Sequence, residues 1–232
     1  MSLLLNVILS LAFVGALGGA VQYWRVQVDA ARRDALQAMA ARRGWALTVT
    51  GTTLGRAGTL RLVPRGGHPW VLEVRPGAGP ERGPVTDYES DEPRWAEGTL
   101  VLVAARLDHL VEAPSAGSDP IEGTPGRLRH EQALRDLLGR DLARLAATLP
   151  QQEAPEGVTV FAEGPLARRL DLQDLARALQ AWTPVAKGPR GVPILVLSPE
   201  GMRLRLRHPV QRADRMERFV DLALDLARLI GP

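Results

Sequence analysis

A run of 21 residues without a charged side chain, from Leu3 to Tyr23, most constrains what this chain can fold into. At a rise of about 1.5 Å per residue, a helix over this run is about 31 Å long, close to the hydrocarbon thickness of a bilayer. A buried helix of a globular protein seldom stays uncharged on every side over this length. Met1 and Ser2 supply no basic region for a cleaved signal peptide. We therefore predict an uncleaved transmembrane anchor over residues 1–25.

Side chains that suit a membrane interface follow the uncharged run. Tyr23 and Trp24 carry amphipathic rings of the kind found at headgroup depth, and Arg25 begins a charged segment. These three residues are the predicted membrane-interface anchor. Arginines predominate over the next ~20 residues, so the positive-inside rule places the carboxy-terminal part of the chain in the cytoplasm. The pattern predicts a single-pass membrane protein.

Five small residues share one face of the predicted transmembrane helix. They follow i, i+3, i+4, i+7, i+8 spacing and are Ala12, Gly15, Ala16, Gly19 and Ala20. Small side chains let a second helix approach closely, which favours packing between membrane helices. They form the predicted helix-packing interface, with other transmembrane subunits and membrane lipid as predicted partners. The run holds no His, Cys, Asp or Glu, so we expect it to ligate no haem or pigment.

The rest of the chain divides by composition into three parts. Residues 26–111 are predicted to form a helix followed by antiparallel strands. Residues 112–128 are dense in Pro, Gly and Ser and indicate a linker or long surface loop. Residues 129–232 are predicted to form an α+β module that ends in an amphipathic helix. The expected fold class is α+β: one transmembrane helix, then small antiparallel sheet modules with packed amphipathic helices.

The individual elements follow from periodicity and from turn-forming residues. Strands are predicted where short apolar or alternating runs lie between glycines and prolines, at 45–50, 59–63, 70–75, 99–104, 158–162, 194–197 and 202–207. Helices are predicted where apolar residues repeat at helical spacing, at 26–43, 129–148, 170–182 and 213–230.

Two segments carry a resemblance to a known family. They are Arg-Arg-Gly-Trp at 42–45 and the closing hairpin and helix GMRLRLRHPVQRADRMERFVDLALDLARL at 201–229. With the preceding anchor and helix, this order resembles a family of uncharacterised single-pass membrane proteins of GC-rich bacteria. The resemblance implies a bacterial inner membrane as the location. The family has no assigned chemistry, so the resemblance implies no activity.

The chain lacks the residue patterns of most catalytic and metal sites. It has no cysteine, and its histidines are scattered without metal-ligand spacing, at His68, His109, His130 and His208. No GxSxG nucleophile motif and no phosphate-binding GK[ST] motif occurs. We therefore predict no catalytic, cofactor-binding or metal-binding residue, no cofactor, and a protein that is not an enzyme.

Charged residues form two local patterns. Asp87, Glu89 and the two acidic residues that follow indicate a solvated loop, or a loop that faces an arginine-rich partner. Arg203, Arg205 and Arg207 alternate with apolar residues, which places three guanidinium groups on one face of a strand. That face is a possible surface for an anionic partner such as lipid headgroups or an acidic subunit. The alternative is a solvated face balanced by nearby Asp and Glu.

Net charge argues against nucleic acid as a partner. The chain has 29 basic and 26 acidic residues, a formal net charge of +3, which offers little drive from counterion release.

The leading hypothesis is a non-catalytic accessory or stabilising subunit of a larger integral membrane complex, respiratory or photosynthetic, anchored through its small-residue stripe. The alternatives are a stand-alone membrane-tethered binding or assembly factor, and a membrane-tethered hydrolase.

Overall fold

The computed structural model describes residues 2–51, 58–77, 83–93, 97–106, 125–182 and 189–231. Side chains are described throughout these ranges except at 2–17, 20, 25, 125–130, 166 and 189. The helices are α1 (Ser2–Arg42), α2 (Pro125–Leu138), α3 (Arg140–Thr148), α4 (Leu166–Arg169), α5 (Leu172–Gln180) and α6 (Ala213–Ile230). The strands are β1 (Trp45–Thr50), β2 (Thr59–Pro64), β3 (Trp70–Arg75), β4 (Val85–Ser90), β5 (Thr99–Val103), β6 (Gln151–Gln152), β7 (Thr159–Glu163), β8 (Ile194–Ser198) and β9 (Gly201–Leu206).

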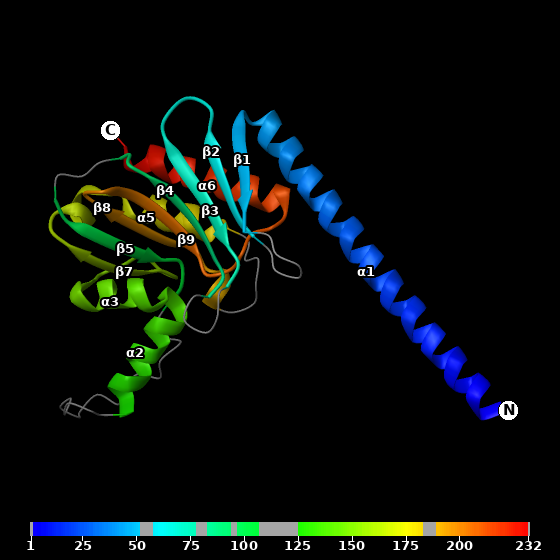
Figure 1. The fold of residues 1–232 in the computed structure, drawn as a ribbon. Helices are drawn as coiled ribbons and strands as arrows, with labels where there is room; N and C mark the ends of the chain where they lie inside the picture. Colours follow the sequence, from blue (N-terminus) through cyan, green and yellow to red (C-terminus); the bar gives the residue numbers. More distant parts are fainter. Residues whose placement is uncertain are drawn as a thin grey trace.

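The nine strands of the described chain form one antiparallel sheet in the order β1-β2-β3-β4-β9-β8-β5-β7-β6 (Figure 1). Strands from the two ends of the chain are interleaved, because β4 pairs with β9 and β5 lies between β8 and β7. The prediction of small antiparallel sheet modules is therefore wrong. The prediction failed because the paired strands are far apart in the sequence. Asp87 and Arg205, which pair across β4 and β9, are 118 residues apart, and local sequence patterns do not reveal such pairings.

The predicted transmembrane anchor is also corrected. A membrane-spanning helix needs about 20 predominantly apolar residues in succession. Within the described residues, no helix meets the combined requirement of length and apolar character for crossing a bilayer. The predictions of a membrane protein, of a single-pass topology and of an inner-membrane location are therefore wrong, and the predicted orientation depended on them.

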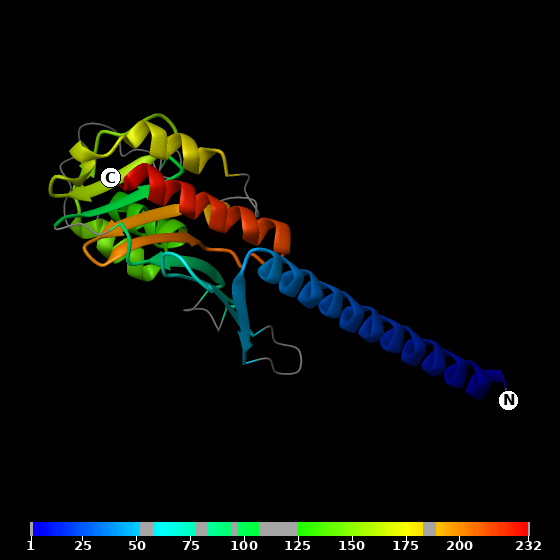
Figure 2. The same ribbon diagram turned by 90° about the horizontal axis from the view of Figure 1, so that it is seen from above.

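The two faces of the sheet are covered differently. We call the first the core face; α5, α6 and the carboxy-terminal end of α1 pack on it and enclose the main hydrophobic cluster (Figure 2). On the second face, α2 and α3 pack over β5, β7 and β8 and enclose a smaller cluster. On the same face, no helix of the described chain packs over β1 to β3 or over Glu89 and Arg203, and we call this region the open face. α3 borders it at Asp141, which pairs with Arg205 of β9. Arg61 and Glu89 are exposed on it.

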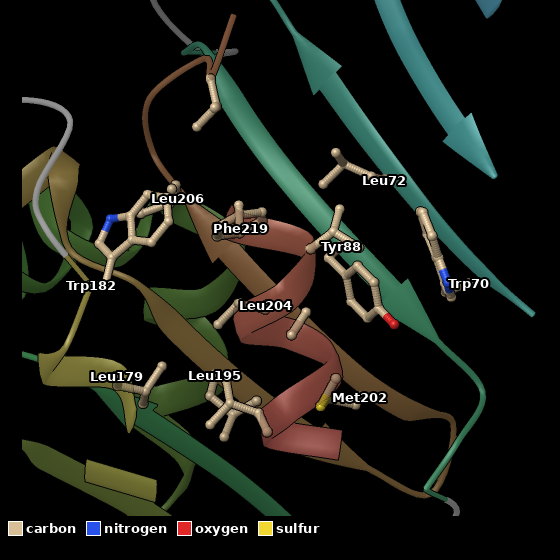
Figure 3. Packing of buried hydrophobic residues seen from close by; sticks show 14 of the residues in the cluster. Trp70, Leu72, Tyr88, Leu179, Trp182, Leu195, Met202, Leu204, Leu206 and Phe219 are labelled. Carbon is tan, nitrogen blue, oxygen red and sulfur yellow. The ribbon is translucent and has the colours of Figure 1, made fainter. Parts of the chain in front are cut away.

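The core face is held by rows of large side chains that cross several strands. Leu72, Tyr88 and Leu204 are direct cross-strand neighbours on β3, β4 and β9, and Phe219 of α6 is buried in the same cluster (Figure 3). All four are at most 1% exposed. Burial of one such side chain contributes about 1.5–3 kcal/mol to folding, so this row fixes α6 on the centre of the sheet. Burial also raises the pKa of the Tyr88 hydroxyl.

Among the described side chains of α1, contacts with the body come from its last three turns, beginning with Arg32, which donates a 2.9 Å hydrogen bond to Gln211. Leu36, Met39 and Ala40 are buried in the main cluster, and Arg42 forms a 2.7 Å ion pair with Glu217 of α6. Arg43 pairs with Asp221, one turn further along α6, and with Glu217. Figure 1 shows the rest of α1 projecting away from the sheet, with the amino terminus at its far end. The body therefore holds α1 by one end.

Two further differences from the sequence predictions concern helix and strand limits. The predicted helix over 129–148 is divided into α2 and α3 at Gly139, whose positive φ of 84° interrupts the helix. The predicted acidic loop contains strand β4, in which Asp87 and Glu89 both point to the second face of the sheet. The predicted strands at 45–50 and 70–75 and the predicted helix at 213–230 are confirmed.

Candidate interaction surfaces

The projecting part of α1 exposes large apolar side chains. Tyr23 is 68% exposed and Trp24 is 66% exposed, and three valines beside them, Val21, Val26 and Val28, are also exposed. At 100° per residue these five positions spread over about 220° of the helix circumference. An amphipathic surface helix has an apolar stripe of about 100° that faces one neighbour. This segment therefore offers apolar surface in more directions than a single flat contact covers.

The predicted helix-packing residues lie mostly outside the described side chains. This is so for Ala12, Gly15, Ala16 and Ala20, and the helix-packing interface stays a prediction. Gly19 is exposed, and a Cβ placed on it meets no atom within 4 Å. In the predicted interface anchor, the hydroxyl of Tyr23 accepts a hydrogen bond of 3.1 Å from Gln27, Trp24 is exposed, and the side chain of Arg25 is outside the described set.

Of the three predicted anionic-partner residues, Arg205 is buried where α3 borders the open face, and a cluster of ion pairs surrounds it. Arg205 is opposite Asp87 in the β4–β9 register and donates to it from Nε at 2.6 Å. Its Nη1 reaches Asp141 of α3, also at 2.6 Å. Arg75 of β3 donates to the second oxygen of Asp87 at 2.6 Å. These ion pairs join β3, β4, β9 and α3, and the two side chains at their centre, Asp87 and Arg205, are buried.

The charges of this cluster shift one another's proton affinity. Burial opposes the charged form of Arg205, but hydrogen bonds and charge from Asp87 and Asp141 outweigh it and raise the pKa of Arg205. Partial burial likewise opposes ionisation of Asp141, yet Arg205 outweighs it, so the pKa of Asp141 lies below its ordinary value. Both groups are therefore held in their charged forms by the fold itself.

The other two arginines of the predicted face also meet groups of this chain. Arg203 pairs with Glu89, its neighbour across β4 and β9. Arg207 donates to the backbone carbonyls of Arg135 and Asp136 near the end of α2. Burial and the nearby charge of Arg190 lower the pKa of Arg207. All three guanidinium groups thus have hydrogen-bond partners within the chain, and contact with an anionic partner stays a prediction.

A groove of about 860 Å³ crosses the open face beside α3. Its floor is a cross-strand row of Val71, Glu89, Arg203 and Val196. The loop at 64–69 and the turn at 198–201 form part of its rim, and α3 contributes Leu142 and Leu145. Apolar side chains lie beside the ion pair of Arg203 with Glu89, and Arg65, Asp91 and Glu200 also line the groove. The lining therefore mixes apolar surface with charges of both signs.

The histidines do not come together. His68 is an exposed partner of Glu92, with 2.7 Å between Nδ1 and Oε2, and His208 lies after β9, where its backbone carbonyl accepts from Thr86. His109 and the side chain of His130 are outside the described residues. Within the described chain, no three His, Asp or Glu side chains are grouped as metal ligands.

Sequence reasoning missed the partnership of Asp87 with Arg205. A signal for it was present, since acidic residues alternate at 87, 89 and 91 with the same period of two as the arginines at 203, 205 and 207. Opposite charges at matched periods indicate two strands that pair.

Comparisons with protein-family models, with characterised proteins and with solved structures find no match for this chain.

Proposed function

We propose that this protein is a non-catalytic accessory subunit of a larger protein assembly, with the projecting part of α1 held between other chains of that assembly. The body, built on the nine-stranded sheet, then lies beside those chains. The observation that carries the proposal is the exposure of Tyr23, Trp24 and the three neighbouring valines on a helix that leaves the body.

The energetics favour a covered segment. These five side chains are roughly half exposed on average, and burying the remainder of each contributes about 1 kcal/mol, or on the order of 5 kcal/mol together. Clustered exposed apolar surface of this kind marks interaction sites in proteins. Because the exposed positions span about 220° of the helix, two or more partner segments are needed to cover them.

The attachment of α1 to the body supports the same proposal. Two ion pairs to α6, Arg42 with Glu217 and Arg43 with Asp221, lie next to the buried Met39. Apolar burial and charge pairing at the same place fix the direction in which α1 leaves the sheet. A helix held in this way positions the body at a defined place on the partner.

The test compares two exposed apolar residues at different places. Trp24→Asp alters the projecting helix, whereas Leu229→Asp alters α6 near the carboxy terminus, where Leu229 is also exposed. Each tagged full-length variant is expressed in the native cell, and the size and subunit stoichiometry of the purified species are measured. We expect Trp24→Asp to lose the assembly and Leu229→Asp to retain it, with equal thermal stability of the isolated chains. Assembly by Trp24→Asp as complete as wild type contradicts the proposal.

A stand-alone binding factor is the second candidate function, and the groove on the open face favours it. Val71 and Arg203 in its floor are partly exposed and so accessible to a bound segment. The two candidates differ in the state of the wild-type chain. A protein that migrates at monomer size after gentle lysis of the native cell excludes the subunit and leaves the binding factor.

A further inference from the structure

β1 is an edge strand without the features that usually protect such an edge. Its sequence WALTVT has no charge and no proline, and it pairs with β2 over all six residues in continuous register. Edge strands of native sheets are commonly protected by charges, prolines, bulges or very short length. The opposite edge of this sheet, β6, has two residues and is protected by its length.

The register identifies the backbone groups that point away from the sheet. Arg65 donates its N–H to the carbonyl of Gly44 at 3.0 Å, which makes these two residues a hydrogen-bonded pair. Antiparallel pairs alternate, so Trp45 opposite Pro64 is a non-hydrogen-bonded pair, consistent with the missing N–H of proline. The N–H and C=O groups of Trp45, Leu47 and Val49 therefore point off the edge, and within the described residues no group pairs with them.

This edge begins where the projecting helix ends. The exposed apolar residues of α1 end at Val28, about 21 Å along the helix from Arg42, and β1 begins at Trp45. A partner chain that continues along α1 toward the body therefore arrives at the outer side of β1. We propose that an extended segment of the partner chain that covers α1 adds a tenth strand to the sheet beside β1. This inference rests on the proposed function and names the way in which the partner engages the body.

The two sides of β1 specify the chemistry of the added strand. On the core face the new strand meets Leu47, which is half-buried, and Val49, which is 43% exposed. On the open face it meets Thr48 and Thr50, which are exposed. The partner segment is therefore five or six residues in which apolar side chains toward the core face alternate with polar ones, and main-chain hydrogen bonds supply much of its affinity.

Amide hydrogen exchange tests the added strand with internal controls. Exchange is measured residue by residue for the full-length chain, alone and within the purified assembly. The amides of Leu47 and Val49 point outward, whereas those of Thr48 and Thr50 point to β2. We expect the outward amides to exchange at least tenfold more slowly in the assembly than alone, and the inward amides to be protected in both. Outward amides that exchange equally fast in both states overturn the inference.

Substitution separates this inference from the proposed function. Val49→Pro removes an outward N–H and leaves the pairs with β2 in place, while Val49→Thr keeps that N–H and is the matched control. We expect Val49→Pro to weaken binding to the assembly at least tenfold and Val49→Thr to change it less than threefold. Equal binding by both variants overturns the strand addition. Protection of the outward amides in the isolated chain that rises with its concentration indicates a second copy, and also overturns it. Failure of the wild-type chain to assemble at all instead counts against the proposed function.

Discussion

Asp87 of β4 and Arg205 of β9 face one another across the centre of the sheet, with two hydrogen bonds of 2.6 and 3.0 Å between guanidinium and carboxylate. Both side chains are buried, and they connect the first half of the chain with its closing hairpin. A buried charge that loses its partner is costly, whereas loss of both charges costs far less when apolar groups replace them. We therefore expect the pair to contribute more to the choice of β9 as the partner of β4 than to net stability.

Removal of one partner provides the first prediction. Asp87→Ala leaves Arg205 with the exposed carboxylate of Asp141, so we expect the free energy of unfolding to fall by about 3 kcal/mol. The double variant Asp87→Leu with Arg205→Met keeps the volume without the charges and is expected to recover most of the loss. Denaturant unfolding of the single and double variants measures both values. A double variant as unstable as Asp87→Ala contradicts this account.

Asp141 makes stability depend on pH. Because its pKa is lower in the folded chain, it contributes stability above the unfolded pKa of about 3.9 and loses that contribution as pH falls through the folded pKa. The side chain is 62% exposed, so the contribution is about 0.5–1 kcal/mol. We expect Asp141→Asn to be less stable than wild type at pH 7, with the difference vanishing well below pH 4. A difference that stays constant from pH 7 to pH 2 excludes this role.

Gly201 is required by close approach between two strand ends. Its φ is 125°, and a Cβ placed on it lies 2.1 Å from the backbone oxygen of Ser90. We expect Gly201→Ala to lower the free energy of unfolding by about 2–3 kcal/mol, because backbone strain and overpacking act together. Gly66 is the control, since its conformation is ordinary and no atom lies within 4 Å of its Cβ position. Thermal unfolding of the two alanine variants should differ clearly, and equal midpoints contradict the assignment.

The ion pairs between α1 and α6 make a further prediction. Glu217 meets Arg42 at 2.7 Å and Arg43 at 3.6 Å, and it is less exposed than either of them. Glu217→Arg places three positive charges together, so we expect a loss of about 1 kcal/mol, partly restored by adding Arg42→Glu. Urea unfolding of both variants at low and high salt measures this coupling, and salt should reduce it. No recovery in the double variant means that the pair does not attach α1.

Local patterns predicted individual elements but not the sheet. The strands at 45–50 and 70–75 and the closing helix were identified because alternation and helical spacing are local properties. The order of strands depends on contacts between distant parts of the chain, such as β4 with β9, and was not predicted. β4 itself was missed because Asp87 and Glu89 make its sequence look like a polar loop, although their charge is balanced only after pairing with Arg205 and Arg203.

For the candidate surfaces too, local features were visible in the sequence, whereas features built from distant residues were not. Tyr23 and Trp24 were predicted to anchor a transmembrane helix at the membrane interface. The structure finds them exposed on a projecting helix, and no helix within the described residues is long and apolar enough to span a membrane. The groove on the open face was not predicted, since Val71, Glu89 and Arg203 meet only when the sheet has formed. Residues far apart in sequence define such a surface, so no single motif indicates it.

Solvent access to α1 within the native assembly shows whether partner chains enclose this helix. Hydroxyl-radical labelling of Tyr23 and Trp24 is compared between the isolated chain and the purified assembly, with Leu229 as the reference because it is 46% exposed near the carboxy-terminal end of α6, away from α1 (Figure 1). We expect labelling of Tyr23 and Trp24 to fall at least tenfold in the assembly while that of Leu229 changes little. Equal labelling of Tyr23 and Trp24 in both states contradicts the proposal that partner chains enclose α1.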